Sequence, residues 1–207
     1  ALGGTVDDTA ATISVSVDGQ TTAATNNGDG TWSLADDTLA ALAEGTFDVT
    51  VTATDAVGNV GTDATSDELT VDLTAPTVTV TTLSTNDAQP ALGGTVDDAA
   101  ATISVSVDGQ TSAATNNGDG TWSLADDTLA ALAEGTFDVT VTATDAVGNV
   151  GSDATSGELT VDLTAPTVTV TTLSTNDTQP ALGGTVDDAA ATISVSVDGQ
   201  TSAATNN

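Results

Sequence analysis

The chain repeats its own sequence with a period of 90 residues. Ala1–Asp8 returns as Ala91–Asp98 and again as Ala181–Asp188, and the first two periods differ at only five positions. A unit of this length exceeds the roughly 20 to 50 residues of a solenoid repeat and suits a small domain with its own core. The sequence therefore predicts a tandem array of domains in which any site recurs once per period. This favours a structural or multivalent role over a single catalytic centre.

The chain has 30 Asp and Glu residues, no Lys, Arg, His or Cys, and a net charge of -30. Salt bridges and disulfides therefore cannot form between its side chains, and mutual repulsion of the carboxylates destabilises the compact state. Cations from solution have to offset this repulsion. The hard ion Ca²⁺ is the natural partner of carboxylate, amide and carbonyl oxygens, so we expect bound calcium. The alternative is an acidic surface that is simply solvated in a saline medium.

The same composition excludes several functions. A polyanion without a basic patch should bind neither nucleic acid nor an anionic membrane surface. Hydrophobic residues make up 38% of the chain and alternate regularly, which argues against disorder. We expect no enzymatic activity, because His, Lys and Cys are absent and the acid pair Asp126 and Asp127 lies in a turn. No signal peptide is visible at Ala1, so we expect an internal segment whose targeting signals lie elsewhere.

Alternation of apolar and polar residues dominates each period, as in Thr102–Val107. Short alternating segments separated by turns rich in Gly, Asp and Asn are typical of strands with one solvated face. Seven such strands in one period predict an all-β fold of tandem immunoglobulin-like β-sandwich domains. The predicted strands are 77–83, 91–96, 102–107, 112–115, 121–125, 136–144 and 158–161.

Inward-facing positions of these strands give a predicted core. It comprises Val78, Val80, Leu92, Val96, Ile103, Val105, Val107, Trp122, Leu124, Leu129, Leu132, Phe137, Val139, Val141, Leu159 and Val161. Only the segment 126–133 resembles a helix, and its length favours a single turn that joins two strands.

Prolines place the domain boundaries. Apart from Pro90 and Pro180, the only prolines are Pro76 and Pro166, and proline lacks the N–H that a central strand requires. We therefore place boundaries near residues 73 and 163. The expected domains are 1–72, which lacks its first strand, 73–162, which is complete, and 163–207, which is the N-terminal half of a third.

Three motifs carry a resemblance to a known family. They are Asp72–Pro76 at the junction, Asn117–Ser123 before a strand, and Ala143–Asn149 after the next one. The whole repeat resembles the bacterial Ig-like repeats of giant RTX-type surface adhesins. The resemblance implies an extender region in an extracellular protein of the bacterial cell surface. It also implies Ca²⁺ near the domain junctions, with the adhesive and anchoring parts at the ends of the full protein.

Strand direction indicates where the calcium ligands meet. If the opening strand leaves the linker and the following strands alternate in direction, the turn at 96–99, the loop at 145–149 and the linker lie at the same end of the domain. The carbonyl of Val147 could add a further ligand. The predicted ligands are Asp72, Asp97, Asp98, Asp145 and Asn149, with Asp7, Asp8, Asp55 and Asn59 in the first domain and Asp162, Asp187 and Asp188 in the third.

Turn chemistry is the competing explanation for these residues, because Asp and Asn side chains also accept hydrogen bonds from nearby backbone. The segment Asn116–Gly120 lacks the spaced acids and the terminal Glu of an EF-hand loop. We therefore expect it to form a tight hairpin.

Three functions follow from these features. The leading hypothesis is a calcium-stabilised spacer of a large bacterial surface adhesin, in which neighbouring repeats of the same chain are clamped at their junctions. The alternative is a segment of a self-assembling extracellular matrix or sheath filament, with lateral association of repeats. The third is a module that binds sugar or ice.

Overall fold

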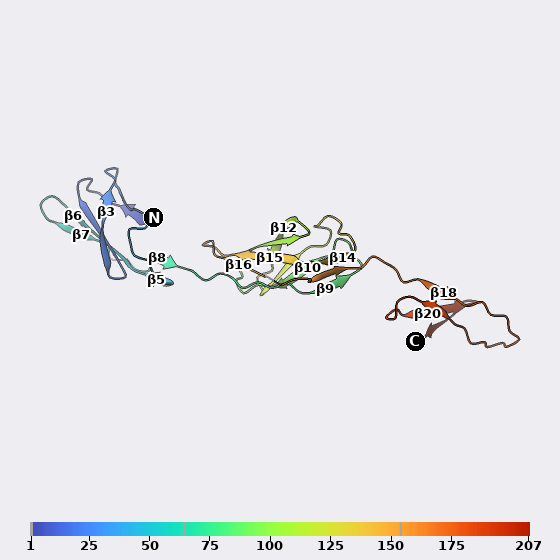
Figure 1. The fold of residues 1–207 in the computed structure, drawn as a ribbon. Coiled ribbons are helices and arrows are strands. Elements are labelled where there is room, and N and C mark those ends of the chain that lie inside the picture. The colour runs from blue at the N-terminus through green and yellow to red at the C-terminus, as the bar shows by residue number, and fades with distance from the viewer. Residues whose placement is uncertain (1, 64, 154) are drawn as a thin grey trace. The chain divides into compact units, whose positions relative to one another are not determined.

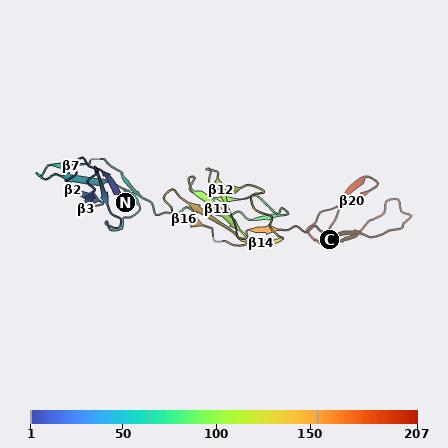
Figure 2. The same cartoon turned by 90° about the horizontal axis from the view of Figure 1, so that it is seen from above.

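The computed structural model describes residues 2–63, 65–153 and 155–207, which form strands and turns without a helix (Figures 1 and 2). The predicted all-β fold is therefore confirmed. With repeat boundaries near residues 73 and 163, the first repeat contains β1 (Leu2–Thr5), β2 (Thr12–Val17), β3 (Gln20–Asn26), β4 (Thr31–Leu34), β5 (Gly45–Phe47), β6 (Val49–Thr54), β7 (Val60–Thr62) and β8 (Leu69–Val71). The second contains β9 (Leu83–Thr85), β10 (Leu92–Thr95), β11 (Thr102–Val107), β12 (Gln110–Asn116), β13 (Thr121–Leu124), β14 (Gly135–Phe137), β15 (Val139–Thr144), β16 (Val150–Ser152) and β17 (Leu159–Val161). The third contains β18 (Val168–Val170), β19 (Gly184–Val186), β20 (Ile193–Val197) and β21 (Gln200–Ala204).

Contacts between Cα atoms divide the chain into two compact units. One unit joins residues 1–77 to 143–151, and the other joins 78–142 to 152–207. The loop after β15 therefore groups with the linker at 72–77, although the two are far apart in sequence.

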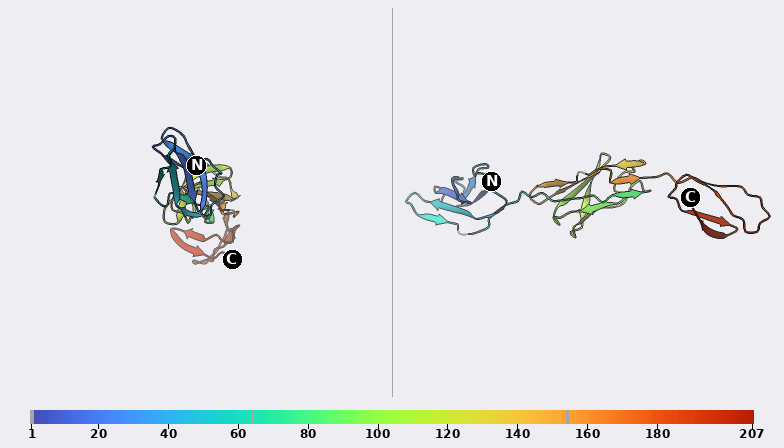
Figure 3. Two further views of the ribbon diagram at one scale, coloured as in Figure 1. Left: turned by 90° about the vertical axis from the view of Figure 1, so that its left-hand side faces the viewer. Right: turned by 60° about the horizontal axis from the view of Figure 1, so that its bottom comes forward.

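Two sheets make up the second repeat, whose strands Figure 3 shows from two further sides. One sheet has the strand order β10-β13-β12-β11-β15-β16, and the other has the order β14-β17-β9. The turn between β11 and β12 is an Asp-Gly hairpin, in which Asp108 and Gly109 have φ angles of 48° and 75°. Positive φ at both central residues matches the twist of the flanking strands, so this turn fixes their register.

The opening segment of the repeat changes partners along its length. Val78 forms an antiparallel bridge with Val96, and the Thr79 amide donates to the Thr95 carbonyl at 3.0 Å. Further on, β9 pairs in parallel with β17, where Leu83 lies opposite Leu159. The expected single strand over 77–83 is thus two short stretches, each hydrogen-bonded to a different sheet.

The predicted strand over 136–144 is also divided. It breaks at Asp138 into β14, which pairs with β17, and β15, which lies beside β11. The sequence also missed β16, because Val150–Ser152 holds one apolar residue and shows no alternation. The tight turn at 145–149 places β16 next to β15, with the Asp145 amide donating to the Asn149 carbonyl at 3.1 Å. The second repeat therefore has nine strands among the described residues instead of seven.

The core agrees with the alternation pattern in most positions. Trp122, Val105 and Leu159 are almost fully buried, and Leu129 and Leu132 are buried as predicted. Two predictions were wrong, since Val80 and Phe137 remain partly exposed. The buried residues that the pattern missed include Ala101, Ala143 and Glu158.

The helix-like segment at 126–133 is irregular and contains a turn at Asp126 and Asp127. Hydrogen bonds hold it against the segment at 88–89. The Leu132 amide donates to the Ala88 carbonyl at 2.9 Å, and the Gln89 side chain donates to the Leu129 carbonyl at 2.7 Å. These partners replace the local bonds of a helical turn. No helix among the described residues has the length and apolar character needed to cross a membrane.

Candidate functional site

The loop after β15 is organised around one carboxylate. Asp145 Oδ1 accepts the amides of Val147, Gly148 and Asn149 at 2.9, 2.7 and 2.9 Å. Its Oδ2 accepts the Asn149 side-chain amide at 2.7 Å. Desolvation alone would raise the pKa of Asp145, but these hydrogen bonds lower it by more, so the net pKa lies below the ordinary value. The carboxylate is therefore held in its charged form.

The side chain of Asn149 also contacts the linker. Its Nδ2 donates to the Asp72 carbonyl at 3.0 Å, and the Asp72 carboxylate accepts the Thr74 amide at 3.0 Å. Two residues further along, β16 lies directly against the linker, because a Cβ added at Gly151 would lie 1.7 Å from the Pro76 carbonyl oxygen. Only glycine allows this approach of the two backbones. Asp145, Asn149 and the backbone of Asp72 therefore lie together, and their role as calcium ligands stays a prediction.

The linker is also attached to the domain that precedes it. The Thr74 hydroxyl donates to Glu44 Oε2 at 2.6 Å. The next junction repeats this contact, since the Thr164 hydroxyl donates to Glu134 Oε2 and the Thr164 amide donates to Asp162 Oδ1 at 3.0 Å. These two Glu–Thr pairs were not predicted, and each spans 30 residues.

The turn that contains Asp97 and Asp98 is held by another residue. Asn116 Nδ2 donates to the carbonyls of Asp98 and Ala101, both at 2.9 Å, and Asp98 Oδ1 accepts the Ala100 amide at 2.8 Å. Asn116 belongs to the predicted hairpin, which is confirmed by the antiparallel pairing of β12 with β13. The turn and the hairpin therefore lie side by side, as strand direction predicts. Asp97 and Asp98 belong to a different compact unit from Asp145, and their part in a shared site stays a prediction.

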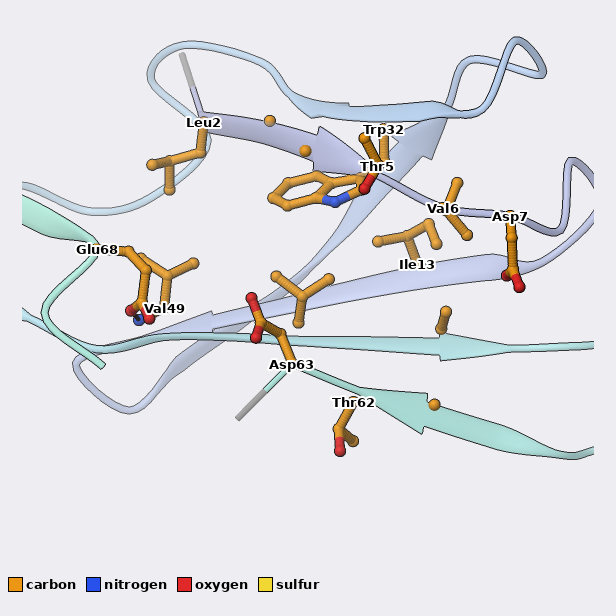
Figure 4. A pocket seen from close by; sticks show the side chains of 15 residues that line it. Leu2, Thr5, Val6, Asp7, Ile13, Trp32, Val49, Thr62, Asp63 and Glu68 are labelled. Atoms are coloured by element: carbon orange, nitrogen blue, oxygen red, sulfur yellow. Dashed lines mark hydrogen bonds between the residues drawn. The ribbon is translucent and has the colours of Figure 1, made fainter. Parts of the chain in front are cut away.

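The other periods repeat these local geometries. In the first, Asp55 accepts the Asn59 side chain at 2.7 Å, and hydrogen bonds from Asn59 lower the pKa of Asp55. Asp8 accepts the Ala10 amide at 2.8 Å, as Asp188 does for Ala190 in the third. Asp7 lines a groove in the first repeat, together with Trp32 and Glu68 (Figure 4).

Asp187 in the third period holds the start of the opening segment, because its Oδ1 accepts the Thr167 amide at 2.8 Å. Backbone and side-chain hydrogen bonds with Thr167 lower the pKa of Asp187. This bond spans 20 residues, whereas Asp8, Asp98, Asp145 and Asp188 accept amides of their own turns. Turn chemistry therefore accounts for at least one hydrogen bond of these four predicted ligands.

The donor set suits calcium in its chemistry, since it consists of carboxylate, amide and carbonyl oxygens. Asp145 Oδ2 accepts a single hydrogen bond from Asn149, and a carboxylate oxygen has capacity for a second partner. However, no group of three or more acidic side chains within 2–63, 65–153 and 155–207 lies close enough to hold a metal ion. The ligands would need to converge further than they do here.

A buried carboxylate escaped the sequence analysis. Glu158 is 3% exposed, its Oε2 accepts the Val139 amide at 3.0 Å, and its Oε1 is buried without a hydrogen-bond partner among the described residues. Desolvation raises the pKa of Glu158, whereas polar contacts from Thr155 and the Val139 amide lower it by more. The available signal was residue type. Each of the two complete periods has only two Glu residues among its acids, and each Glu accepts a hydrogen bond from a residue 19 or 30 positions away.

Two stretches of the chain, residues 2–73 and 78–163, match the profile of the bacterial Ig-like domain. The chain belongs to the bacterial Ig-like domain family. The match covers more than half of the residues, and it agrees with the paired sheets and with the resemblance seen in the sequence motifs. No curated protein matches the chain.

Two solved structures similar to this bacterial Ig-like array come from large adhesins. A tetra-tandem repeat in the extending region of a large adhesion protein is 27% identical, with 98% of this chain and 57% of that chain covered and a TM-score of 0.39. A Ca²⁺-stabilised adhesin that helps an Antarctic bacterium reach out and bind ice is 28% identical, with 98% and 56% covered and a TM-score of 0.41. The chain therefore spans a little over half the length of these structures.

Proposed function

We propose that this array is a spacer in a bacterial surface adhesin and that Ca²⁺ stiffens its junctions. The observation that carries the proposal is the contact set of the linker. Glu44 binds Thr74 on one side, and Asn149 binds the Asp72 carbonyl on the other. A linker held by both of its neighbours resists bending, whereas a free segment of this length would act as a hinge.

Calcium would complete this clamp. Asp72 and Asp145 supply carboxylates, Asn149 supplies an amide oxygen, and Asp97 and Asp98 are the further predicted ligands. The same set recurs as Asp162, Asp187 and Asp188 at the next junction and as Asp7, Asp8, Asp55 and Asn59 in the first repeat. A bound divalent ion neutralises charge in a chain of net charge -30, and it stabilises the native state more as the free ion concentration rises above its Kd.

An extracellular position at the bacterial cell surface fits this role. Calcium is abundant outside the cell, and a chain without Cys does not depend on the redox state of its compartment. The array would hold a separate adhesive part away from the cell, so its own surface need not recognise a ligand. No catalytic role is included in the proposal.

Small-angle scattering and calorimetry of the 207-residue chain, in calcium and in EGTA, test the proposal. We expect an extended monomer in calcium and a more flexible, less stable chain after chelation. An identical scattering profile and melting temperature in both conditions would rule out calcium. Growth of the mass with protein concentration in calcium, by lateral association, would favour a filament over a spacer.

The variant Asp145→Ala locates the ion. Because Asp145 organises the loop and faces the linker through Asn149, its loss should weaken calcium binding in a titration. Asp138→Ala is the matched control, since the Asp138 carboxylate accepts the Gly157 amide and is not one of the predicted ligands. Equal losses in both variants would indicate diffuse condensation of cations on a polyanion.

A further inference from the structure

A second carboxylate lies close to the buried Glu158. Asp153 Oδ1 accepts the amide and the hydroxyl of Thr155 at 3.0 and 2.9 Å, and Asp153 Oδ2 accepts the Val80 amide at 2.7 Å. Desolvation and the negative charge of Asp153 both raise the pKa of Glu158, while contacts from Thr155 and the Val139 amide lower it by more. The second repeat therefore holds two carboxylates within reach of each other's charge, and one of them is buried.

The hydroxyl of Thr155 contacts both carboxylates. It donates to Asp153 Oδ1, and it also lies against the Glu158 carboxylate. A hydroxyl carries a single proton, so it can donate to only one of the two acids at a time. One carboxylate therefore always faces the hydroxyl oxygen without its proton, and a cation stabilises such an arrangement.

The second oxygen of Glu158 independently requires a partner. Oε1 is buried and accepts no hydrogen bond among the described residues. Buried carboxylate oxygens are normally paired, because the loss of their hydration is costly. The chain has no Lys, Arg or His that could pair with it, so a positive partner has to come from solution. A water molecule would satisfy the oxygen but would leave the two negative charges uncompensated.

The same hydrogen bonds recur in the first repeat. The amide and the hydroxyl of Thr65 donate to Asp63 Oδ1 at 3.2 and 3.0 Å, and the Val49 amide donates to Glu68 Oε2 at 2.9 Å. Figure 4 shows Asp63 and Glu68 on the wall of one pocket. The spacing Asp-x-Thr-x-x-Glu therefore produces this arrangement in both repeats.

The oxygen set selects the kind of ion. Two carboxylates and a hydroxyl are hard donors, and a divalent cation neutralises their two charges. Ca²⁺ accepts an irregular set of six to eight oxygens, whereas Mg²⁺ demands near-ideal octahedral geometry. Thr155 is exposed, so the cluster reaches solvent on that side and water can complete the coordination of the ion.

We propose that Asp153, Thr155 and Glu158 bind a Ca²⁺ ion within the second repeat, at a site separate from the domain junction. The opening segment of the repeat is attached to both acids, since the Val80 amide donates to Asp153 Oδ2 and the Leu83 amide donates to the Glu158 carbonyl at 2.7 Å. The ion therefore ties the opening segment to the loop before β17. None of the predicted junction ligands takes part, so either proposal can fail while the other stands.

Trp122 provides a local probe of this site. Its indole donates to the Thr79 carbonyl at 2.8 Å, and the Val80 amide, which belongs to the same peptide group, donates to Asp153 at 2.7 Å. The indole nitrogen and the Asp153 carboxylate are therefore no more than about 8 Å apart. Tb³⁺ replaces Ca²⁺ at oxygen sites and emits when a nearby tryptophan transfers energy to it. In a chain with Trp32→Phe, Trp122 is the only tryptophan, so the emission reports on the second repeat.

The direct test is a Tb³⁺ titration of the full chain carrying Trp32→Phe and Asp145→Ala, the second of which removes the carboxylate that organises the junction loop. We expect saturable emission that Ca²⁺ displaces. Adding Glu158→Gln should weaken the apparent affinity at least about tenfold, because one of two charged ligands is lost. Glu134→Gln is the matched control, since it removes the same charge from an exposed side chain and should leave the affinity unchanged.

Two outcomes of the titration would overturn the proposal. Equal losses in Glu158→Gln and Glu134→Gln would indicate diffuse condensation of ions on the acidic chain. Emission that is already abolished by Asp145→Ala would place the ion at the junction, which would refute the interior site and leave the junction clamp intact.

Unfolding of the second repeat gives an independent readout. In the same background, the urea midpoint followed by Trp122 fluorescence should rise with Ca²⁺ concentration, because the ion binds the native state. Glu158→Gln should show no rise, and its circular dichroism in the absence of urea checks that it is folded. Thr155→Val keeps both carboxylates and should reduce the rise. A rise that persists in Glu158→Gln, or an equal rise with NaCl at the same ionic strength, would refute a divalent ion at this site.

Discussion

Gly94→Ala should release the opening segment of the second repeat. A Cβ at this position would lie 1.9 Å from the Thr79 carbonyl oxygen and 2.7 Å from the Trp122 indole nitrogen. The first of these distances is far below van der Waals contact with a backbone atom, so the segment has to move away. Its displacement removes the bonds of Thr79 and Thr81 to the sheet and the bond from Trp122.

The size of the effect follows from the lost contacts. Three hydrogen bonds contribute about 1 kcal/mol each, and exposure of the buried Val78 adds more, which gives a loss of about 3–5 kcal/mol. This is a large part of the stability of a small domain, which is about 5–15 kcal/mol. Urea unfolding followed by the fluorescence of Trp122, in a Trp32→Phe background, measures it.

Gly4→Ala is the matched control, because the three atoms nearest to the added Cβ, at 2.8, 3.2 and 3.4 Å, all belong to the Trp32 side chain. It should destabilise the first repeat by about 1 kcal/mol or less, since one side chain can shift. A loss below about 1 kcal/mol in Gly94→Ala, or equal losses in both variants, would refute the role of close backbone packing at this glycine.

Three further predictions concern charge and backbone conformation. Glu158→Gln should lower the melting temperature at neutral pH, because a carboxyl with a lowered pKa stabilises the fold while it is ionised. The difference in melting temperature from the parent chain should shrink as pH falls below the ordinary Glu pKa of 4.5, and a difference that stays constant with pH contradicts this. Gly157→Asp should destabilise the second repeat by about 1 kcal/mol, because Gly157 has a positive φ of 77°, which glycine adopts at lower cost than Asp. Asp67 holds the equivalent position in the first repeat with φ of 68°, so the reverse change Asp67→Gly should stabilise that repeat, and urea unfolding checks both variants. Thr74→Val should make the first junction more flexible in small-angle scattering by removing the bond to Glu44, whereas Thr46→Val, which loses only a 3.5 Å contact with Thr70, should not.

The candidate site was predictable in part. Strand direction correctly placed the loop at 145–149 beside the linker, as the bond from Asn149 to Asp72 confirms. Residue type alone could not predict which oxygen atoms are used, because Asp145 and Asp98 satisfy nearby backbone amides through local turns. The convergence of Asp97 and Asp98 on the same ion stays a prediction.

The sequence by itself determined the period, the all-β class and most of the core, because alternation and turn residues act over a few neighbouring positions. Tertiary structure decided what depends on partners distant in sequence. It divided the opening segment between two sheets and buried Glu158, whose Oε2 accepts the Val139 amide. The physical reason is that burial and strand pairing depend on elements that pack together in space, and those elements are distant from one another in sequence.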